Sequence, residues 1–330
     1  KLKNKIIKKT KDEFPEGIQP YGADALRFCF CALGSTGRDI SFDLKRIEGY
    51  RNFCNKLWNA SRFVYMTTNG YQYQDRIKFD DLKTYEKFMI IKLDALVTEY
   101  KKHCTSYRFD LMANSLYSFI WNEYCDWFVE ISKVEIDNGN EYTKNVLIYT
   151  LQIILKLCHP IIPYITEEIW REMNSLGYTK DEILMNAKFP SQQKIFKDGD
   201  IEAEVLLLKE FITKIRKTRS DLNVHPKIKI DIYCFSKDSL VKNFLDSNNS
   251  IICSLLKAQN IFINEESFNI NECITVSLEN LKVYIPIKKI IDIKKERERL
   301  IKNMSNLESN LLKIEGKLNN KNFIEKAPSE

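Results

Sequence analysis

The sequence is most informative at Gly49-Tyr50-Arg51-Asn52-Phe53-Cys54-Asn55-Lys56-Leu57-Trp58-Asn59-Ala60-Ser61-Arg62-Phe63. On a helical wheel at about 100° per residue, the apolar residues of this stretch and its continuation gather on one side. These residues are Phe53, Leu57, Ala60 and Val64. We therefore predict a long helix from about Asp43 to Thr67, ended by Asn69-Gly70, with one face buried in a core.

The opposite face of this helix has an unusual composition. Arg51, Asn55 and Arg62 fall close together on the wheel, Asn59 flanks them on one side, and Trp58 and Tyr65 flank them on the other. A face that serves only solubility would be expected to carry Glu and Lys pairs. Arg can hold a phosphate bidentately, Asn can pair with base edges, and an aromatic ring can stack on an unpaired base for about 1–3 kcal/mol. The face predicts contact with RNA, and a polar helix–helix interface is the alternative.

Further amphipathic segments with short connections predict a helical bundle. A short buried helix covers residues 23–30 and is broken by Gly34-Ser35-Thr36-Gly37. Longer helices are expected at Asp81–His103, with Asp81 as its cap, at Asp110–Lys133 and at Tyr142–Cys158, and another begins near Pro163.

The pattern changes after Pro190. One more helix is expected from Ile201 to Asp221, and the alternation of Lys227–Ile232 predicts a strand. Cys273–Leu278 and Leu281–Ile287 predict a hairpin. Together these elements predict a small α/β domain after the bundle.

The last predicted helix has a heptad pattern. Its two seams are Ile293, Leu300, Leu307, Ile314 and Arg297, Met304, Leu311, Leu318, apolar except for Arg297. Such a seam needs a partner helix, which is expected to be intermolecular or to lie outside this chain.

Charge and length limit the possible functions. A chain of 330 residues is expected to form two or three domains, and it has no run of eighteen apolar residues. The net charge of +6 is concentrated in three basic clusters, at Lys1–Lys11, Lys214–Lys229 and Lys282–Lys302. Such clusters fit a long polyanion touched at several points, and for each one a solvated face is the alternative. Because the chain starts with Lys1 and has no signal peptide, we expect it to begin within a longer protein.

No catalytic or metal site is predicted. None of the nine cysteines forms a C-x-x-C pair, and the three histidines are too scattered for zinc. Asn122 and Asp126 are four apart between Trp121 and Trp127 and could line a pocket. The favoured interpretation is a buried polar pair that fixes helix packing while the tryptophans fill the core. We find no nucleophile–base set.

The order of these motifs resembles the carboxyl-terminal half of class I aminoacyl-tRNA synthetases, and most closely the bacterial valyl-tRNA synthetases. The resembling pieces span nearly the whole chain and are Phe14–Ile18, Gly22–Phe28, Ser35–Ile40, Glu48–Phe63, Trp121–Trp127 and His159–Trp170. The resemblance implies a mainly α fold, with an anticodon-binding helical bundle, a small α/β domain and a terminal coiled-coil helix. A bacterial isoleucine enzyme would be expected to end in a cysteine-rich zinc module. None of the cysteines in this chain is spaced for such a module, and the heptad helix at the end instead resembles the valine enzymes.

The resemblance also implies a division of labour along the chain. Residues 1–43 would be a stem-contact segment following the catalytic domain, and residues 44–190 the anticodon-binding bundle. Residues 191–291 would form a small linker domain, and 292–330 the first helix of a truncated tRNA-binding coiled coil. The implied RNA-binding residues are Arg38, Arg51, Asn55, Lys56, Trp58, Asn59, Arg62, Lys294, Lys295, Arg297 and Arg299.

The family's ATP-binding signatures, His-x-Gly-His and Lys-Met-Ser-Lys-Ser, are absent from this sequence. We therefore expect no cofactor in this chain and no activity from it alone. ATP with Mg²⁺ and valine would bind in the missing catalytic domain. The expected partners are the tRNA for valine and the missing catalytic and editing domains, with no membrane and no DNA. The full-length enzyme would be a cytoplasmic monomer. The alternative is a free-standing RNA-binding or assembly subunit, such as half of a split synthetase, that recruits a partner through Ile293–Leu318.

Overall fold

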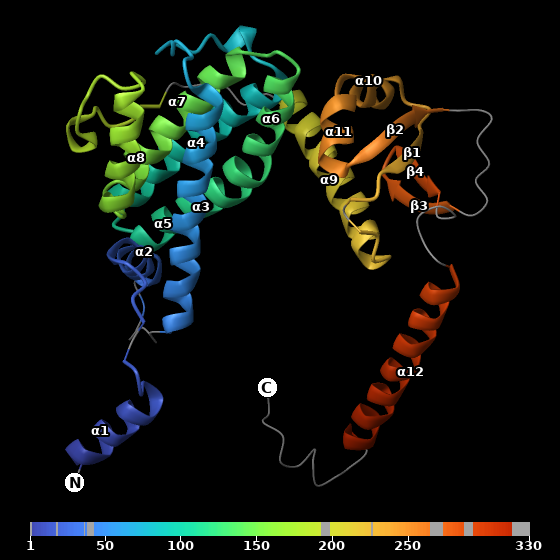
Figure 1. Ribbon diagram of the computed structural model, residues 1–330, viewed down its shortest axis with the longest axis horizontal. Helices are drawn as coiled ribbons and strands as arrows, with labels where there is room; N and C mark the ends of the chain where they lie inside the picture. Colours follow the sequence, from blue (N-terminus) through green and yellow to red (C-terminus); the bar gives the residue numbers. More distant parts are fainter. Residues whose placement is uncertain are drawn as a thin grey trace. The chain divides into compact units, whose positions relative to one another are not determined.

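The computed structural model describes residues 2–17, 19–35, 37, 43–192, 199–225, 227–264, 273–286 and 293–318. The chain divides into two compact units, Lys1–Val205 and Leu206–Glu330, and helix α9 crosses the division. The first unit is helical, and the second combines helices with a small sheet (Figure 1). The predicted order, a mainly α fold followed by a small α/β part, is confirmed.

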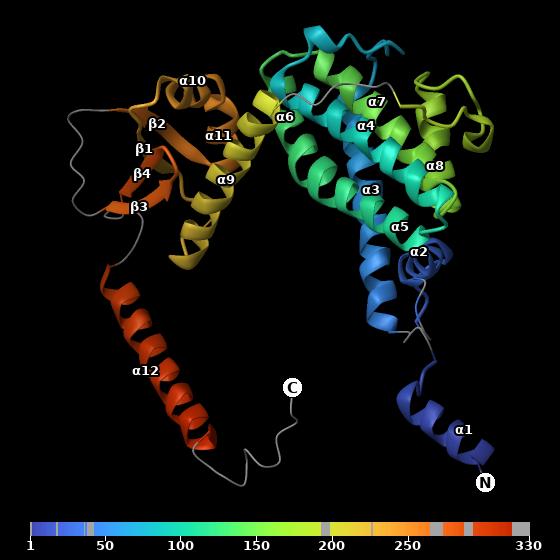
Figure 2. The ribbon, with the colours of Figure 1, turned by 180° about the vertical axis from the view of Figure 1, so that it is seen from behind.

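The first unit is a bundle of helices around one apolar core. Its central helices, α3, α4, α7 and the α5–η2–α6 run, pack against one another, as both views show (Figures 1 and 2). The helices are α1 (Leu2–Glu13), α2 (Ala23–Leu33), α3 (Leu44–Thr68), α4 (Thr84–Thr105), α5 (Phe109–Ser118), the π-helix η2 (Phe119–Phe128), α6 (Val129–Asp137), α7 (Tyr142–Cys158) and α8 (Pro163–Ser175), with short 3-10 turns at Phe79–Asp81 and Leu184–Asn186.

Two expected features of these helices differ in the structure. Asp81 does not cap α4, because it lies in a 3-10 turn and the helix begins after Lys83. The Lys83 backbone N–H donates instead to the buried Glu86 carboxylate at 2.9 Å. The predicted helix at Asp110–Lys133 is one continuous helical run, but its middle third is π-helical rather than α-helical.

The second unit contains a four-stranded sheet of order β2-β1-β4-β3. β1 is parallel to β2 and antiparallel to β4, and β4 is antiparallel to β3. The inward side chains of β1, at Ile230, Ile232 and Cys234, are buried. The elements of this unit are α9 (Gly199–Asp221), β1 (Ile230–Phe235), α10 (Ser239–Ser247), α11 (Asn249–Leu256), β2 (Ala258–Ile263), β3 (Cys273–Leu278), β4 (Leu281–Pro286) and α12 (Ile293–Leu318).

The hairpin and the terminal helix were predicted correctly, whereas the first strand begins three residues later than predicted. Helices α10 and α11 and strand β2 were not predicted. The two helices lie in the crossover that carries the chain from β1 to its parallel neighbour β2, a connection that parallel strands require.

Among the described residues, no helix combines the length and the hydropathy needed to cross a bilayer.

Candidate nucleic-acid interface

Helix α3 carries the candidate interface. Its first residue follows Asp43, whose carboxylate accepts the Lys45 backbone N–H at 2.9 Å and so caps the helix. Gly70, with φ of 77°, reverses the chain after it. Phe53, Leu57 and Val64 have no exposed surface, which confirms the predicted core face.

The outer face of α3 forms a row of exposed side chains. Asn55, Asn59 and Arg62 are exposed as predicted, and Asn52 extends the row by one turn. Trp58 borders it with 37% of its surface exposed. These residues recur at spacings of three and four, so they follow one stripe of the helix. The stripe presents amide groups, one guanidinium and one indole ring to solvent.

Three residues near this row are engaged within the protein. The guanidinium of Arg51 lies 5.6 Å from the centre of the Tyr21 ring, and Arg51 is half-buried. The Lys56 ammonium pairs with the Asp126 carboxylate at 2.5 Å and lies 3.7 Å from the centre of the Trp121 ring. The Tyr65 hydroxyl donates to the Ile169 carbonyl at 2.7 Å, so Tyr65 points into the bundle rather than flanking the outer face.

The interpretation of Asn122 and Asp126 as a buried polar pair was wrong. Both residues are exposed, while Trp121 and Trp127 are half-buried. The Asn122 amide donates to the Ser118 hydroxyl at 3.3 Å, and Asp126 pairs with Lys56. The two residues are four apart as predicted, but they lie on the solvent-exposed side of η2 rather than between helices.

The remaining candidate RNA-binding residues lie elsewhere. Arg38 and the side chains of Lys294 and Lys295 lie outside the described residues. Arg297 is exposed on α12. Arg299 is half-buried and donates to the Asp221 carbonyl at 2.8 Å. The candidate residues that α3 brings together are therefore Asn55, Trp58, Asn59 and Arg62, with Lys56 at the border.

The basic cluster at Lys214–Lys229 is partly structural. Arg219 is only 7% exposed, and its guanidinium donates to the backbone carbonyls of Leu256, His225 and Ile228. Arg216 donates to the Leu255 carbonyl at 3.0 Å. These groups therefore satisfy backbone acceptors inside the second unit, and Arg219 is not available to a polyanion.

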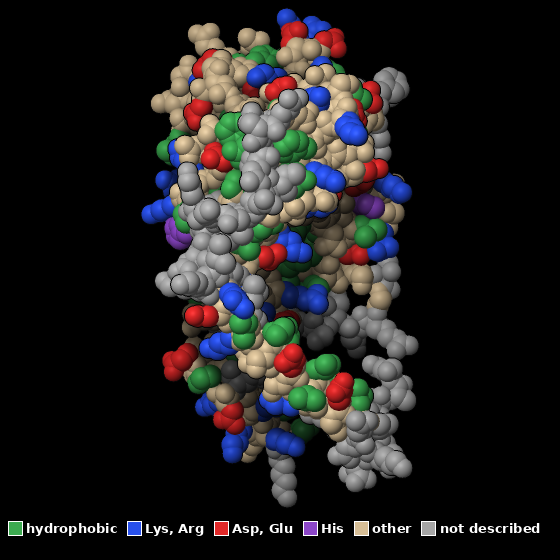
Figure 3. Space-filling model, turned by 90° about the vertical axis from the view of Figure 1, so that its right-hand side faces the viewer, with side chains coloured by type: hydrophobic (Ala, Val, Ile, Leu, Met, Phe, Trp, Pro, Cys, Tyr) green, Lys and Arg blue, Asp and Glu red, His purple; other side chains and the backbone are tan. Residues whose placement is uncertain are grey.

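Lys and Arg side chains are interspersed with Asp and Glu on the face shown in Figure 3.

On the described part of α12, the apolar seam residues are exposed rather than packed. Met304, Leu307, Leu311, Ile314 and Leu318 each have more than half of their surface exposed, at 57%, 68%, 56%, 55% and 59%. The structure therefore provides no described partner for this seam.

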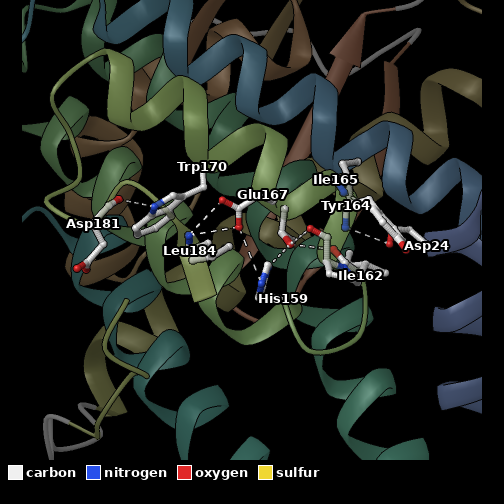
Figure 4. A network of polar contacts seen from close by, with 11 residues as sticks. Asp24, His159, Ile162, Tyr164, Ile165, Glu167, Trp170, Asp181 and Leu184 are labelled. Atoms are coloured by element: carbon white, nitrogen blue, oxygen red, sulfur yellow. Dashed lines mark hydrogen bonds and ion pairs between the residues drawn. The ribbon is translucent and has the colours of Figure 1, made fainter. Parts of the chain in front are cut away.

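Sequence reasoning missed how α2 is attached to the bundle (Figure 4). The Asp24 carboxylate accepts the backbone N–H groups of Ile165 at 2.7 Å and Tyr164 at 3.4 Å, at the start of α8. Arg27 donates to the carbonyls of Ile161 at 2.8 Å and Pro160 at 3.1 Å. Asp24 and Arg27 thus attach α2 to the turn before α8 and to the first residues of that helix.

His159 belongs to the same turn. Its Nδ1 lies 2.9 Å from the Thr166 hydroxyl, and its buried Nε2 has no hydrogen-bond partner among the residues that the structure describes. The Glu167 carboxylate is 3.9 Å from Nε2 and accepts the Leu184 backbone N–H. Burial lowers the pKa of His159 below its usual value, and the nearby Glu167 offsets only part of this effect.

The described residues contain no group of three or more His, Cys, Asp or Glu side chains that could hold a metal ion. The buried thiols are also unreactive in character, because burial raises the pKa of Cys54 and of Cys125 to about 12. The outer face of α3 presents hydrogen-bond donors, hydrogen-bond acceptors and one indole ring to solvent.

Comparison with known proteins gives two family matches. Residues 86–234 match the anticodon-binding domain of tRNA ligases, and residues 292–330 match the valyl tRNA synthetase tRNA binding arm.

Curated relatives align along the whole chain. The valine--tRNA ligase of Buchnera aphidicola subsp. Acyrthosiphon pisum is 38% identical over 336 residues, covering 100% of this chain and 35% of that protein. The valine--tRNA ligase of Francisella tularensis subsp. tularensis is 38% identical over 334 residues, covering 99% of this chain and 36% of that protein. The chain thus spans about a third of the length of these relatives.

A solved LeuRS–tRNA–LeuAMS ternary complex from Agrobacterium radiobacter K84 has a TM-score of 0.41 and 14% identity to this chain. The matched region covers 64% of this chain and 27% of the matched chain in that complex.

Proposed function

Because the chain belongs to the valine--tRNA ligase family, we propose that its 330 residues are the tRNA-binding portion of such an enzyme, which uses ATP to attach valine to its tRNA. The observation that carries the proposal is the pair of matched regions, and the exposed row on α3, which lies outside both regions, supports it. The matched regions are named for binding an anticodon and a tRNA. The row offers an amide, guanidinium and indole surface suited to single-stranded RNA.

The RNA contact would use Asn55, Asn59 and Arg62 together with Trp58. Arg62 is exposed, so its guanidinium can take a phosphate through two hydrogen bonds. The amides of Asn55 and Asn59 can both donate to and accept from base edges. Trp58 can stack on an unpaired base, which is the usual way in which proteins hold the bases of a loop.

We assign the regions as follows. Residues 1–43 are the stem-contact segment, and residues 44–190 hold the anticodon arm. Residues 191–291 link this bundle to the last helix, and residues 292–330 form one helix of a tRNA-binding coiled coil. In that helix Arg297 and Arg299, with Lys294 and Lys295, would meet phosphates, as Arg38 would in the first region. The Asp221 carbonyl would compete for Arg299.

Valine activation would be performed by the part of the enzyme outside this chain. ATP, Mg²⁺ and valine would bind there, because the sequence lacks both ATP-binding signatures and the described residues offer no metal-ligand cluster. The tRNA for valine and the catalytic and editing domains would be the partners, and the full-length enzyme would act as a cytoplasmic monomer. Valine-dependent ATP–pyrophosphate exchange by the 330-residue chain alone would contradict this assignment.

The test is tRNA binding by the chain. Fluorescence anisotropy with a labelled valine tRNA transcript is measured for the wild type and for Arg62→Glu. Arg171→Glu is the matched control, because Arg171 is an exposed arginine on α8 of the same unit. We expect Arg62→Glu to weaken binding by at least tenfold, and Arg171→Glu to weaken it by less than threefold. Equal effects of the two substitutions would refute a specific α3 interface.

A second candidate is a free-standing subunit that recruits a partner through α12. The exposed seam residues Met304, Leu307 and Leu311 favour it. Light scattering separates the candidates, because recruitment through this seam predicts a stable dimer or a complex, whereas a severed intramolecular coiled coil predicts a monomer.

A further inference from the structure

One cation beside the α3 row is already paired with an anion of the protein. The Lys56 ammonium lies 2.5 Å from the Asp126 carboxylate and 3.7 Å from the centre of the Trp121 ring. The Asp126 side chain is 47% exposed and that of Lys56 is 24% exposed. The pair therefore lies at the surface, where a dissolved anion can reach it.

The π-helical geometry of η2 brings these two partners to the same lysine. Trp121 and Asp126 are five residues apart, and in an α-helix they would lie about 140° apart around the axis. In a π-helix the hydrogen bonds join residues five apart, as from the Val129 N–H to the Tyr124 carbonyl. Residues five apart then lie closer together around the axis than they do in an α-helix. The π-helical geometry thus helps to bring both groups to the side of η2 that contacts Lys56.

The orientation of Trp121 is fixed from the core outward. Its ring stacks on Tyr117 with centres 5.6 Å apart and planes inclined by 10°. Tyr117 in turn stacks on the buried Phe53 of α3, with centres 5.1 Å apart. The indole face under Lys56 is thus held by an aromatic stack that begins on the same helix as the lysine. The lysine stem would keep its direction if the carboxylate were removed, because the cation–π contact would remain.

We propose that Lys56 is a phosphate-binding residue for the RNA backbone, and that Asp126 occupies its ammonium until an RNA phosphodiester displaces the carboxylate. This inference rests on the proposed tRNA-binding function. A carboxylate and a phosphodiester offer a lysine the same kind of acceptor, namely an anionic oxygen. Lys56 borders the exposed row of Asn52, Asn55 and Asn59, so RNA lying along that row would bring its backbone to this point.

Exchange of one anion for another has a definite thermodynamic signature. The free protein gives up the Lys56–Asp126 pair on binding, and Asp126 is left beside the incoming phosphate. Removing the charge of Asp126 should therefore tighten binding, although it removes a contact from the free protein. An exposed ion pair is worth up to about 1 kcal/mol, which corresponds to about fivefold in affinity.

The experiment compares Asp126→Asn, Lys56→Met and the double variant by anisotropy with the labelled valine tRNA transcript across a range of KCl concentrations. Asp75→Asn is the matched control, because Asp75 forms an exposed pair with Lys180 at 2.8 Å and its loss changes the net charge equally. Thermal unfolding verifies that each variant is folded.

We expect Asp126→Asn to tighten binding about fivefold and Asp75→Asn to change it by less than twofold. Lys56→Met should weaken binding and reduce the slope of log affinity against log salt by about 0.7–0.9, the value for one phosphate contact. Asp126→Asn should have a smaller effect in the Lys56→Met background than in the wild type. Weaker binding by Asp126→Asn, or equal effects of Asp126→Asn and Asp75→Asn, would overturn the proposal.

A repeat with inorganic phosphate replacing chloride at the same ionic strength uses free phosphate as a competitor for the site. The proposal predicts that phosphate weakens tRNA binding by the wild type more than tRNA binding by Lys56→Met, and equal weakening of the two proteins would overturn a phosphate site at Lys56. The two proposals also fail differently. Absence of tRNA binding by the wild-type chain refutes the proposed function, whereas tRNA binding that responds to Arg62→Glu but not to Asp126→Asn refutes only the exchange at Lys56.

Discussion

Replacing Asp24 with alanine should destabilise the first unit by about 2–3 kcal/mol. The Asp24 carboxylate is 9% exposed and accepts the Ile165 N–H at 2.7 Å, while its contact with Tyr164 is longer at 3.4 Å. We count one good hydrogen bond to a charged group, worth about 1.5–2 kcal/mol. A negative charge at the start of a helix adds about 0.5–1 kcal/mol, because it offsets the partial positive charge of the unpaired N–H groups.

The assay is urea unfolding followed by tryptophan fluorescence. All four tryptophans, Trp58, Trp121, Trp127 and Trp170, lie in the first unit, so the signal reports that unit alone. With a slope of about 2 kcal/mol per M, the midpoint should fall by about 1–1.5 M urea with the slope unchanged.

A second substitution separates the charge from the hydrogen bond. Asp24→Asn keeps an acceptor oxygen but loses the charge, so it should cost about 1 kcal/mol, less than Asp24→Ala. Asp75→Asn serves as the control for loss of an exposed carboxylate and should stay within about 0.5 kcal/mol of the wild type. An Asp24→Ala protein as stable as this control would show that the Asp24 contacts do not hold α8 in place.

Three further predictions use the same fluorescence assay. Leu57→Ala should cost about 2–5 kcal/mol, because Leu57 is fully buried; a cost below 1 kcal/mol would contradict its place in the core. Gly70→Ala should cost about 1–2 kcal/mol for its φ of 77° alone, since nothing lies within 4 Å of an added Cβ; no loss would mean that the turn relaxes. The pKa of His159 is lower in the folded protein than in the unfolded chain. Its contribution to the free energy of unfolding is therefore complete above about pH 6.5, the pKa in the unfolded chain, and is lost as the pH falls towards the pKa in the folded protein. His159→Asn should therefore show a smaller stability loss between pH 7.5 and 5.5 than the wild type, and an equal loss would exclude His159 as the cause.

The sequence was sufficient where periodicity alone decides structure. Phe53, Leu57 and Val64 recur at helical spacing, and all three are buried on α3 as predicted. The same arithmetic located the exposed residues Asn55, Asn59 and Arg62. It failed for Arg51 and Tyr65, because a wheel gives the direction of a Cβ and not the reach of a long side chain towards Tyr21 or Ile169.

Features that depend on tertiary contacts were not predictable from the sequence. The spacing of residues in Trp121–Trp127 does not distinguish a π-helix from an α-helix, and the segment packs against both α3 and α4. Asp24 and Arg27 act on a turn more than 130 residues away. Helix α11 ends before Lys257, which has a φ of 52°, where a glycine would have marked the boundary.

The start of α10, by contrast, has a signal in the sequence. Asp238 caps this helix, and an aspartate before an apolar run is typical of a helix start.

The π-helix also limits how this protein can change its length over evolutionary time. A single-codon deletion in Phe119–Phe128 outside Trp121–Asp126 that returned the segment to α geometry would place these two side chains about 140° apart around the axis. Trp121 and Asp126 would then face different neighbours, although neither codon had mutated. We expect this ten-residue segment to tolerate conservative substitutions at exposed positions such as Asn122 far better than a change in residue number.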